Sequence, residues 1–263
     1  MIGTIDISWP GMLAAYCLLL IPLAMLLWQG VSILGRVAIA AVRMTVQLLF
    51  VGLYLQFVFN LDNAWLNCAW LLVMILVADV SILRHCRLRV RCFGLSLFVA
   101  LILGTGVPLL YFTMLILRRP QILEARTLIP IGGMILGNCL RADIIGIRHF
   151  YDTIKRDSRT FEYTLAQGAQ LREAIQPYLR EAFHNAVSPT IATMMTIGLV
   201  SLPGMMTGVI LGGQPPVTAI KYQVAIMIAI FTGTAIAMPC AILMSLKRGF
   251  HASGPLRKDV FTD

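Results

Sequence analysis

The sequence predicts an all-α polytopic membrane protein with seven transmembrane helices, the N-terminus outside and the C-terminus in the cytoplasm. Three observations predict this fold. Hydrophobic residues make up 59% of the 263 residues and charged residues only 13%, which is outside the range of soluble domains. Apolar runs of about 20 residues, long enough to cross a bilayer core of about 30 Å, recur along the chain. Most Lys and Arg residues flank these runs, as the positive-inside rule requires.

Seven runs are long enough to span, and together they make a single transmembrane domain over residues 1–263. The fifth run carries Asn138, Arg141 and Asp143 in its second half. A six-span alternative that omits this run would place both termini on the same side. The seven predicted spans are Trp9–Leu34, Val37–Phe59, Ala64–Leu83, Phe93–Leu117, Leu128–Ile147, Pro189–Leu211 and Gln223–Leu246.

Charge asymmetry sets the predicted orientation. With the C-terminus in the cytoplasm, alternation also places the Arg84–Arg91 loop and the Arg148–Arg180 segment inside. This distribution favours the N-out arrangement, and it accounts for the net charge of +9 without a nucleic-acid partner. No Lys or Arg precedes Arg36, so the first span lacks the basic start of a cleaved signal and is expected to be retained. The basic residues left outside are Arg118, Arg119, Arg126 and Lys221.

The one sizeable polar segment, residues 148–187, is predicted to be cytoplasmic. After Asp157 or Ser158, either of which is a suitable N-cap, apolar residues recur at helical spacing. Pro177 is expected to kink or split this helix. The result would be a pair of short amphipathic helices. They would either lie on the lipid headgroups or form a docking element for a cytosolic partner.

The stretch SLPGMMTG places a proline and a glycine inside an apolar run. In lipid every backbone polar group needs a partner, so such a break is tolerated only beside other protein or a wet cavity. We expect it to act as a hinge or cavity wall in an alternating-access transporter; a static kink is the alternative. The residues of this predicted hinge are Pro203, Gly204, Met205, Met206 and Gly208.

Small residues at four-residue spacing predict close helix packing. Gly204, Gly208 and Gly212 form one ridge, and Gly133 and Gly137 another. We therefore expect the fifth to seventh spans to form a tight sub-bundle. The ridge of the last span consists of Ala225, Ala229, Gly233, Ala237 and Ala241.

Polar side chains inside the spans predict a polar layer near the cytoplasmic face. Such residues are costly in lipid and usually face the bundle interior. Arg43 and Asp79 lie at similar depth and are expected to pair. The layer would consist of satisfied structural pairs or line a solvent-filled entry vestibule. Its members are Arg43, Gln47, Asp79, Asn138, Arg141 and Asp143.

Several catalytic and cofactor motifs are absent. No GxxxxGK[ST] occurs, so the chain itself is not expected to bind ATP. HExxH and GxSxG are missing as well, which argues against an intramembrane hydrolase. The six cysteines form no CxxC pair and indicate neither a disulfide framework nor a zinc site. The methionines of the sixth span would suit a soft ion rather than iron, and they are more typical of flexible core packing. The metal ligands are therefore unknown.

The sequence Glu162-Tyr-Thr-Leu-Ala-Gln-Gly168-Ala169 resembles the EAA loop of bacterial importers of the ATP-binding cassette (ABC) class. In those permeases the loop forms a short helix that seats in a groove of the ATPase. The downstream Ile-x-Leu-Pro of that loop is missing here. The residues expected to couple to an ATPase are Glu162, Gly168, Ala169, Leu171 and Ile175.

A longer resemblance extends over essentially the whole chain. The runs IPIGGMILGN (129–138), SPT (188–190), GLVSLPGMMTG (198–208) and AIKYQ (219–223) resemble the FetB-type iron-export permease family. That family includes the membrane subunit of a plant aluminium-tolerance ABC transporter.

The resemblance implies the membrane subunit of an ATP-driven exporter of iron or another metal in the bacterial inner membrane. It also implies two permeases paired with two separate ATPase subunits, which would bind ATP and Mg²⁺, whereas this chain would bind no cofactor. Iron as the substrate rests on the resemblance alone. Two alternatives remain. One is a permease for a nucleotide-sugar or another anion, since the polar layer holds two arginines. The other is a scaffold or receptor subunit that transports nothing.

Overall fold

The computed structural model describes residues 8–61, 63–117, 123–251 and 254–257. Every regular element within these ranges is a helix, apart from two isolated backbone bridges, Ile197–Ser201 and Phe250–Leu256. The prediction of an all-helical chain is confirmed for the described residues. Most of these helices are long and apolar, and they pack side by side along their lengths.

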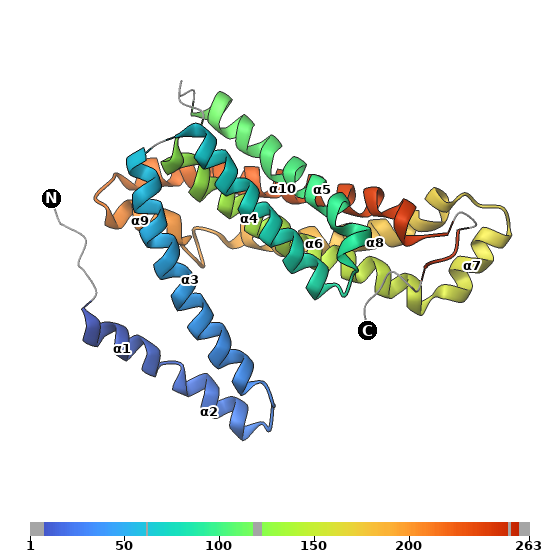
Figure 1. Ribbon diagram of the computed structural model, residues 1–263, viewed down its shortest axis with the longest axis horizontal. Coiled ribbons are helices and arrows are strands. Elements are labelled where there is room, and N and C mark those ends of the chain that lie inside the picture. The colour runs from blue at the N-terminus through green and yellow to red at the C-terminus, as the bar shows by residue number, and fades with distance from the viewer. Residues whose placement is uncertain (1–7, 62, 118–122, 252–253, 258–263) are drawn as a thin grey trace.

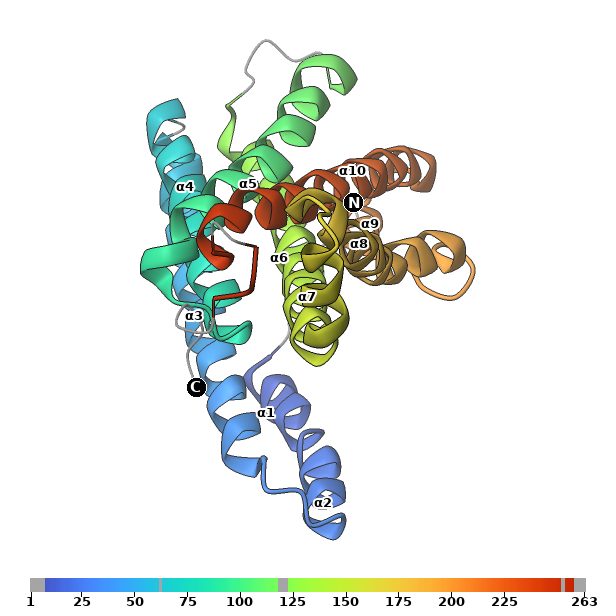
Figure 2. The same cartoon turned by 90° about the vertical axis from the view of Figure 1, so that its right-hand side faces the viewer.

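An elongated bundle forms the body of the molecule (Figure 1). It consists of α4 (Ala64–His85), α5 (Val90–Tyr111) with the π-helical turn η1 (Phe112–Ile116), α6 (Ala125–Arg156), α8 (Leu171–Thr196) and α10 (Pro216–Gly249). The short helix α7 (Ser158–Ala166) closes one end, and α9 (Gly204–Leu211) lies near the other. We call these the α7 end and the α9 end. Figure 2 views the molecule from the α7 end.

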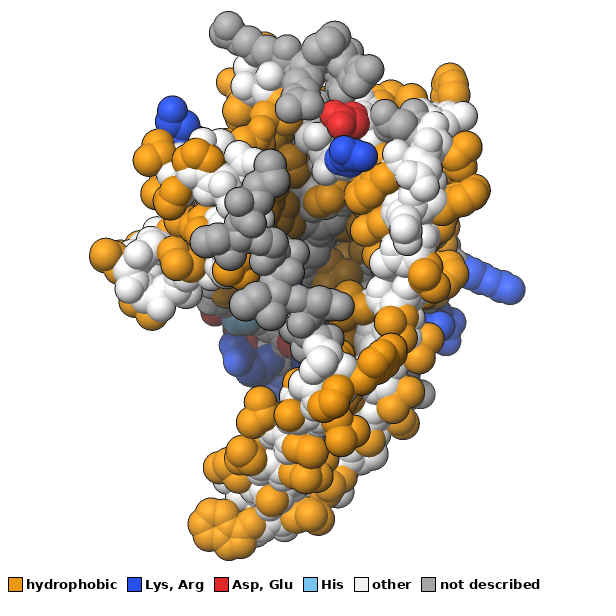
Figure 3. All heavy atoms as spheres, turned by 90° about the vertical axis from the view of Figure 1, so that its left-hand side faces the viewer, with side chains coloured by type: hydrophobic (Ala, Val, Ile, Leu, Met, Phe, Trp, Pro, Cys, Tyr) orange, Lys and Arg blue, Asp and Glu red, His pale blue; other side chains and the backbone are white. Residues whose placement is uncertain are grey.

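The first three helices form an arm that projects from the bundle: α1 (Trp9–Cys17), α2 (Leu20–Trp28) and α3 (Leu34–Leu61). Only the last turns of α3 pack against the body. There Val58 is buried beside Ala125 and Ile129 of α6, and the ring of Tyr54 stacks on Trp70 of α4 at 4.0 Å. The rest of the arm is covered with exposed hydrophobic side chains (Figure 3), which is the composition of a surface facing lipid.

Six stretches of helix in the described ranges are long and apolar enough to cross a membrane: 9–28, 34–61, 64–85, 90–116, 125–156 and 216–249. Four of the predicted spans, the second, third, fifth and seventh, each lie within one of them, and the fourth ends one residue beyond the 90–116 stretch. The first predicted span ends too late. Its helical part stops at Trp28, and Gly30 turns the chain with a φ of 67° before α3 begins at Leu34.

The sixth predicted span, Pro189–Leu211, is wrong as a continuous helix. Helix α8 ends at Thr196, residues 197–203 are not helical, and α9 has only eight residues. Gly198 takes a φ of 88°, which an α-helix does not accommodate. Pro203 has no backbone N–H to donate a helical hydrogen bond. Together α8 and α9 nevertheless return the chain from the α7 end to the α9 end, where α10 begins (Figure 1).

The boundaries predicted for the 148–187 segment also differ from the helices. Helix α6 runs without interruption to Arg156, well past Arg148, and α8 continues far beyond residue 187. A helix pair does form, but it divides at Gly168, with a φ of 93°, rather than at Pro177, which lies inside α8. Asp157 precedes α7 without a side-chain capping bond, whereas Gln170 and Glu173 form a capping box that starts α8.

The closest helix contact is a seam between α5 and α10. A Cβ atom added at Gly233 would lie 2.6 Å from the carbonyl oxygen of Gly104, and one added at Gly104 would lie 2.5 Å from the Cβ of Ala237. The small-residue ridge predicted for the last span therefore mediates close packing, as expected. It packs on the fifth predicted span, as expected, since a Cβ added at Gly233 would lie 2.9 Å from Ile135 Cγ2 of α6, and also on the fourth predicted span. A Cβ added at Gly204 or Gly208 would meet nothing within 4 Å, so the ridge predicted for the sixth span does not pack.

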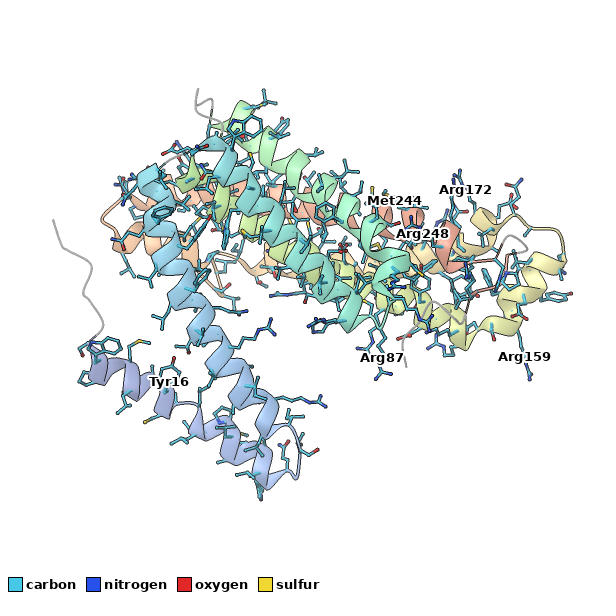
Figure 4. All side chains as sticks on the ribbon, viewed as in Figure 1. Tyr16, Arg87, Arg159, Arg172, Met244 and Arg248 are labelled. Carbon is cyan, nitrogen blue, oxygen red and sulfur yellow. The ribbon has the colours of Figure 1, made fainter. Side chains whose placement is uncertain are left out.

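Basic side chains gather at the α7 end. The turn between α4 and α5, the ends of α6 and α10, and the α7–α8 pair all contribute. Figure 4 labels Arg87, Arg159, Arg172 and Arg248 at this end. Arg118 and Arg119 lie outside the described residues, while Lys221 and Arg126 are at the beginnings of α10 and α6. The α7 and α9 ends therefore differ strongly in charge.

Candidate functional site

A cavity of about 310 Å³ lies between α6, α8, the 197–203 segment, α9 and α10. This volume is at the lower end of the range of about 300–1,000 Å³ typical of small-molecule sites. The break between α8 and α9 opens the wall here, because non-helical backbone replaces a helix that would otherwise fill the space. Pro203, Gly204 and Met205 form part of that wall.

The polar lining comes from four different segments. Asn138 and Arg141 project from α6, one turn apart, and Gln223 comes from α10. Two threonines of α8 and Ser201 of the non-helical segment complete the set. The hydroxyl of Thr193 donates to the carbonyl oxygen of Pro189 at 2.9 Å, so its oxygen remains available as an acceptor.

Arg141 and Gln223 are the two lining residues without the partners their chemistry calls for. Arg141 is exposed and makes no ion pair with any residue that the structure describes. Gln223 is 8% exposed, and its Oε1 atom is buried without a hydrogen-bond partner. Buried polar groups are almost always paired, but this oxygen is inaccessible to solvent, so it is sealed within the packing and does not face the cavity.

The structure brings together two groups of residues that the sequence analysis treated separately. Asn138 and Arg141 of the predicted polar layer share this cavity with Pro203, Gly204 and Met205 of the predicted hinge. Met206 and Gly208 lie further along α9 and do not line it. Since both sets lie around one cavity, the break in the predicted sixth span lies beside a partly polar cavity, as the need to satisfy its backbone requires.

The remaining members of the predicted polar layer lie elsewhere, and the expected pair of Arg43 with Asp79 does not form. Arg43 and Gln47 are exposed on α3, in the projecting part of the arm. Asp79 is buried on α4, and its Oδ1 has no hydrogen-bond partner. Equal depth in the sequence did not imply contact, because α3 leans away from α4 along most of its length (Figure 1).

Asp143 is two residues from Arg141 but faces a different environment. It is fully buried, and neither carboxylate oxygen has a hydrogen-bond partner. It lies one turn from Cys139, whose thiol is 3.9 Å from the carbonyl oxygen of Gly104 on α5. Helix α6 therefore presents Arg141 to the cavity and Asp143 to the sealed side of the bundle.

No metal centre is preformed within the described ranges, since no three His, Cys, Asp or Glu side chains are grouped to hold an ion. Nor does the cavity lining, as described, include any carboxylate or imidazole. The methionines among its walls are Met134, Met205 and Met227. Their thioethers suit soft ions, whereas iron prefers harder ligands.

An aromatic cluster attaches the α7–α8 pair to the bundle. Phe161 of α7 is 2% exposed, and its ring lies 5.9 Å from Tyr178 of α8 and 5.8 Å from Phe250. Phe250 in turn lies 6.4 Å from both Phe150 and Tyr151 of α6. Burial, and secondarily the charge of Asp157, raises the pKa of the Tyr178 hydroxyl, so this ring stays neutral. The cluster makes α7 a fixed extension of α6 and α10.

Two polar contacts reinforce this attachment. The Tyr151 hydroxyl lies 2.8 Å from the Ser245 Oγ of α10. On the other side of α6, His149 Nε2 lies 2.9 Å from Glu181 Oε1 of α8. The two contacts join α6 to both neighbouring helices near the α7 end.

The residues predicted to couple to an ATPase differ in how much of their surface is exposed to solvent. Glu162 and Gly168 are exposed on α7 and on the turn that follows it, and Ala169 and Leu171 are half-buried. Ile175 is 1% exposed and belongs to the core beneath the helix pair. Only the first four therefore present any surface to a partner.

Three lining groups were not predicted as site residues: Gln223, the pair Thr190 and Thr193, and Ser201. Gln223, Thr190 and Ser201 nevertheless lie within the runs AIKYQ, SPT and GLVSLPGMMTG that carry the family resemblance. Gln223 was taken as the edge of the last span, but α10 begins at Pro216, two turns earlier. Thr190 and Thr193 are three residues apart on α8, a spacing that puts both on one helix face. That spacing, together with the family runs, was the available signal.

The fold and the cavity define a helical, multi-spanning membrane protein with a cavity in its bundle that is lined by apolar residues and a few polar ones. The model of the family described as "Uncharacterised protein family (UPF0014)" matches residues 9–250. The chain belongs to this family, which confirms the family resemblance found in its sequence.

Curated relatives span most of the chain. It is 35% identical over 226 residues to "UPF0014 membrane protein slr1647" of Synechocystis, covering 86% of this chain and 85% of that one. It is 32% identical to "Protein ALUMINUM SENSITIVE 3" of Arabidopsis thaliana, covering 81% and 77%. It is 29% identical to "Probable iron export permease protein FetB" of Escherichia coli, covering 80% of each. No solved structure matches the chain.

Proposed function

We propose that this chain is the membrane subunit of an ATP-driven ABC transporter that exports iron or another metal ion. A separate cytosolic ATPase would bind ATP and Mg²⁺ and supply the energy. The relative named as a probable iron export permease supports both the transport function and the metal. A two-plus-two complex of permeases and ATPases follows from the same resemblance, and the bacterial inner membrane is the expected location.

The observation that carries this proposal is the attachment of α7 at the basic end of the bundle. A short exposed helix that receives force from an ATPase must be fixed to the helices that surround the transport path. The aromatic cluster fixes α7 to α6 and α10, and both of these helices line the cavity. Glu162 and Gly168 are the exposed points at which the ATPase would bind.

The charge distribution supports an orientation with the α7 end in the cytoplasm. Counting α8 with α9 as one broken crossing, the chain crosses seven times, with its N-terminus outside and its C-terminus inside. The sixth crossing then provides the flexible wall. Pro203 and Gly204 would serve as the hinge by which the cavity opens to alternate sides.

Co-purification with the ATPase tests the coupling. We expect Glu162→Lys and Gly168→Pro to abolish recovery of an ATPase that is co-expressed with the chain, because both change the exposed tip of the α7–α8 pair. Lys221→Glu, a charge reversal at the α9 end, is the matched control and should leave recovery unchanged. Equal recovery with all three variants would place the ATPase elsewhere and overturn the proposed coupling.

Arg141 favours a second candidate, in which the transported solute is a nucleotide-sugar or another anion. A lone guanidinium in a cavity attracts negative groups and repels a bare metal cation. ATPase activity of the reconstituted complex separates the two candidates. Stimulation by ferrous iron alone would support metal export, and stimulation by an anion without metal would support the second candidate.

A further inference from the structure

Four exposed arginines surround the turn between α4 and α5, and none of them makes an ion pair with a residue that the structure describes. Asp152 of α6 lies within electrostatic range of Cys86 in this turn, but it is paired with Arg148 at 3.6 Å. The turn therefore carries an excess of positive charge. Its basic residues, which we call the arginine turn, are Arg84, Arg87, Arg89 and Arg91.

One of the four occupies a position that favours glycine. Arg87 has a φ of 53°, which is the left-handed conformation. The Leu88 amide donates to the carbonyl oxygen of Leu83 at 2.9 Å, and the Arg87 amide donates to that of Arg84 at 3.4 Å. This is the Schellman pattern that ends a helix, usually with glycine where Arg87 stands. A side chain there strains the backbone, and such strain is common where a residue has a function beyond folding.

The arginine turn lies about one bilayer thickness from the start of α6. The Cys86 Sγ atom lies 3.7 Å from the carbonyl oxygen of Ile144, and the ring of Phe93 lies 6.0 Å from that of Tyr151, also on α6. At 1.5 Å per residue, Ile144 is about 29 Å along α6 from Ala125, which matches a hydrocarbon core of about 30 Å. A bilayer that begins where α6 begins therefore ends at this turn, and the arginines reach the layer of lipid headgroups.

The surroundings of the turn favour lipid over a protein partner. Hydrophobic side chains are exposed within two helical turns of the arginines, Val77 on α4 and Leu95 on α5. The surface proposed for the ATPase lies further out, because α6 continues past the turn to Arg156 before α7 begins. Figure 4 shows Arg87 set back along the bundle from Arg159 of α7.

We propose that the arginine turn binds the headgroups of anionic phospholipids at the membrane surface. The forked donors of a guanidinium match two oxygens of a phosphate. Clusters of four or more basic residues beside a spanning helix are typical of binding to anionic lipids. Arg248 of α10 donates to the carbonyl oxygen of Cys92 at 2.9 Å, so a headgroup held here lies beside the ends of α4, α5 and α10. This site goes beyond the proposed function and does not require the ATPase.

Lipid retention by the purified full-length chain tests the proposal. The chain is placed in nanodiscs of equal parts phosphatidylglycerol and phosphatidylcholine, and the lipids that stay bound are counted by native mass spectrometry. We expect a preference for phosphatidylglycerol that falls as sodium chloride is raised, since salt screens exposed charges. Sodium phosphate at equal ionic strength should reduce it no further. The absence of any preference, or stronger displacement by phosphate, which indicates a site for a soluble anion, would overturn the proposal.

Variants assign the preference to the turn. Arg87→Gly removes one guanidinium and relieves the backbone, so the preference for phosphatidylglycerol should fall about fivefold with no loss of thermal stability. Adding Arg89→Gln should bring the loss to about 25-fold. Arg159→Gln, at an exposed arginine of α7, is the matched control and should change the preference less than about twofold. An equal loss in the control, or an unchanged preference in the double variant, would contradict the site.

Recovery of a co-expressed ATPase separates this proposal from the proposed function. If the Arg87→Gly, Arg89→Gln double variant loses the ATPase but keeps its preference for phosphatidylglycerol, the turn belongs to the partner interface and the lipid assignment is wrong. If the preference falls as expected and no ATPase associates even with the unaltered chain, the lipid site stands and the transporter proposal fails.

Discussion

The α5–α10 seam and the α8–α9 break contain the same kind of small residues and use them in opposite ways. In the seam, Gly104 and Gly233 are in such close contact that neither could carry a side chain without displacing its neighbour. In the break, Gly204 and Gly208 have open space around them. The seam gains stability from close packing, whereas the break provides space beside a cavity. Glycine spacing alone does not tell which use applies.

Hydrogen exchange should give the largest contrast between the two regions. Backbone amides of α10 around Gly233 are within a long helix. In residues 197–203, by contrast, only the amides of Ile197 and Val200 make helix-type hydrogen bonds, and the other bonds are turn contacts. Local opening of poorly packed segments costs little. We expect amides of the 197–203 segment to exchange at least about a thousandfold faster, a difference of about 4 kcal/mol, as measured by mass spectrometry in nanodiscs. Equal protection would mean that the break is rigid and does not act as a hinge.

Matched alanine substitutions should separate the regions by stability. Gly233→Ala places a methyl group 2.6 Å from a backbone oxygen of α5, and we expect a loss of about 1–3 kcal/mol from overpacking. Gly208→Ala meets nothing and should be neutral or slightly stabilising, because alanine favours the helix. Thermal unfolding followed by size-exclusion chromatography compares the two variants. A greater loss at Gly208 would contradict the difference in packing.

The smallest expected change concerns Asp143, on the sealed side of α6. A buried polar group without a partner costs about 1–3 kcal/mol, so Asp143→Val should raise the free energy of unfolding by about 1 kcal/mol. Asp152→Val, which removes an exposed ion pair with Arg148, is the control and should stay within about 0.5 kcal/mol. A clear destabilisation by Asp143→Val would show that water or an ion satisfies this carboxylate.

Predicting spans from the sequence succeeded where an apolar run coincides with one uninterrupted helix. The second, third, fifth and seventh predicted spans each lie within a long helix, and the fourth ends one residue beyond its helical stretch. The sixth failed because average hydropathy does not register helix continuity, and Gly198 and Pro203 interrupt the run. The cytoplasmic helix pair was predicted to divide at Pro177. Instead Pro177 lies inside α8, and the chain turns at Gly168, which adopts a left-handed conformation.

The candidate site was predictable only in part. Sequence position gives the expected depth of a residue in a membrane, and Asn138 and Arg141, one turn apart on α6, do line one cavity. It does not give the direction in which a helix leans or faces. Arg43 therefore lies on a separate arm, and Asp143 points away from Arg141. The contacts of Gln223 with the cavity depend on how α10 packs against α6, which no local pattern encodes.

The length of α6 has a mechanical consequence. With 32 residues and a rise of 1.5 Å per residue, it is about 48 Å long, against a hydrocarbon core of about 30 Å. The stretch from Arg141 to Arg156 is about 22 Å of unbroken helix that acts as a stiff lever. Under the proposed function, a swing of about 10° pivoting at Arg141 would displace its far tip by about 4 Å, a movement that force applied at α7 would produce.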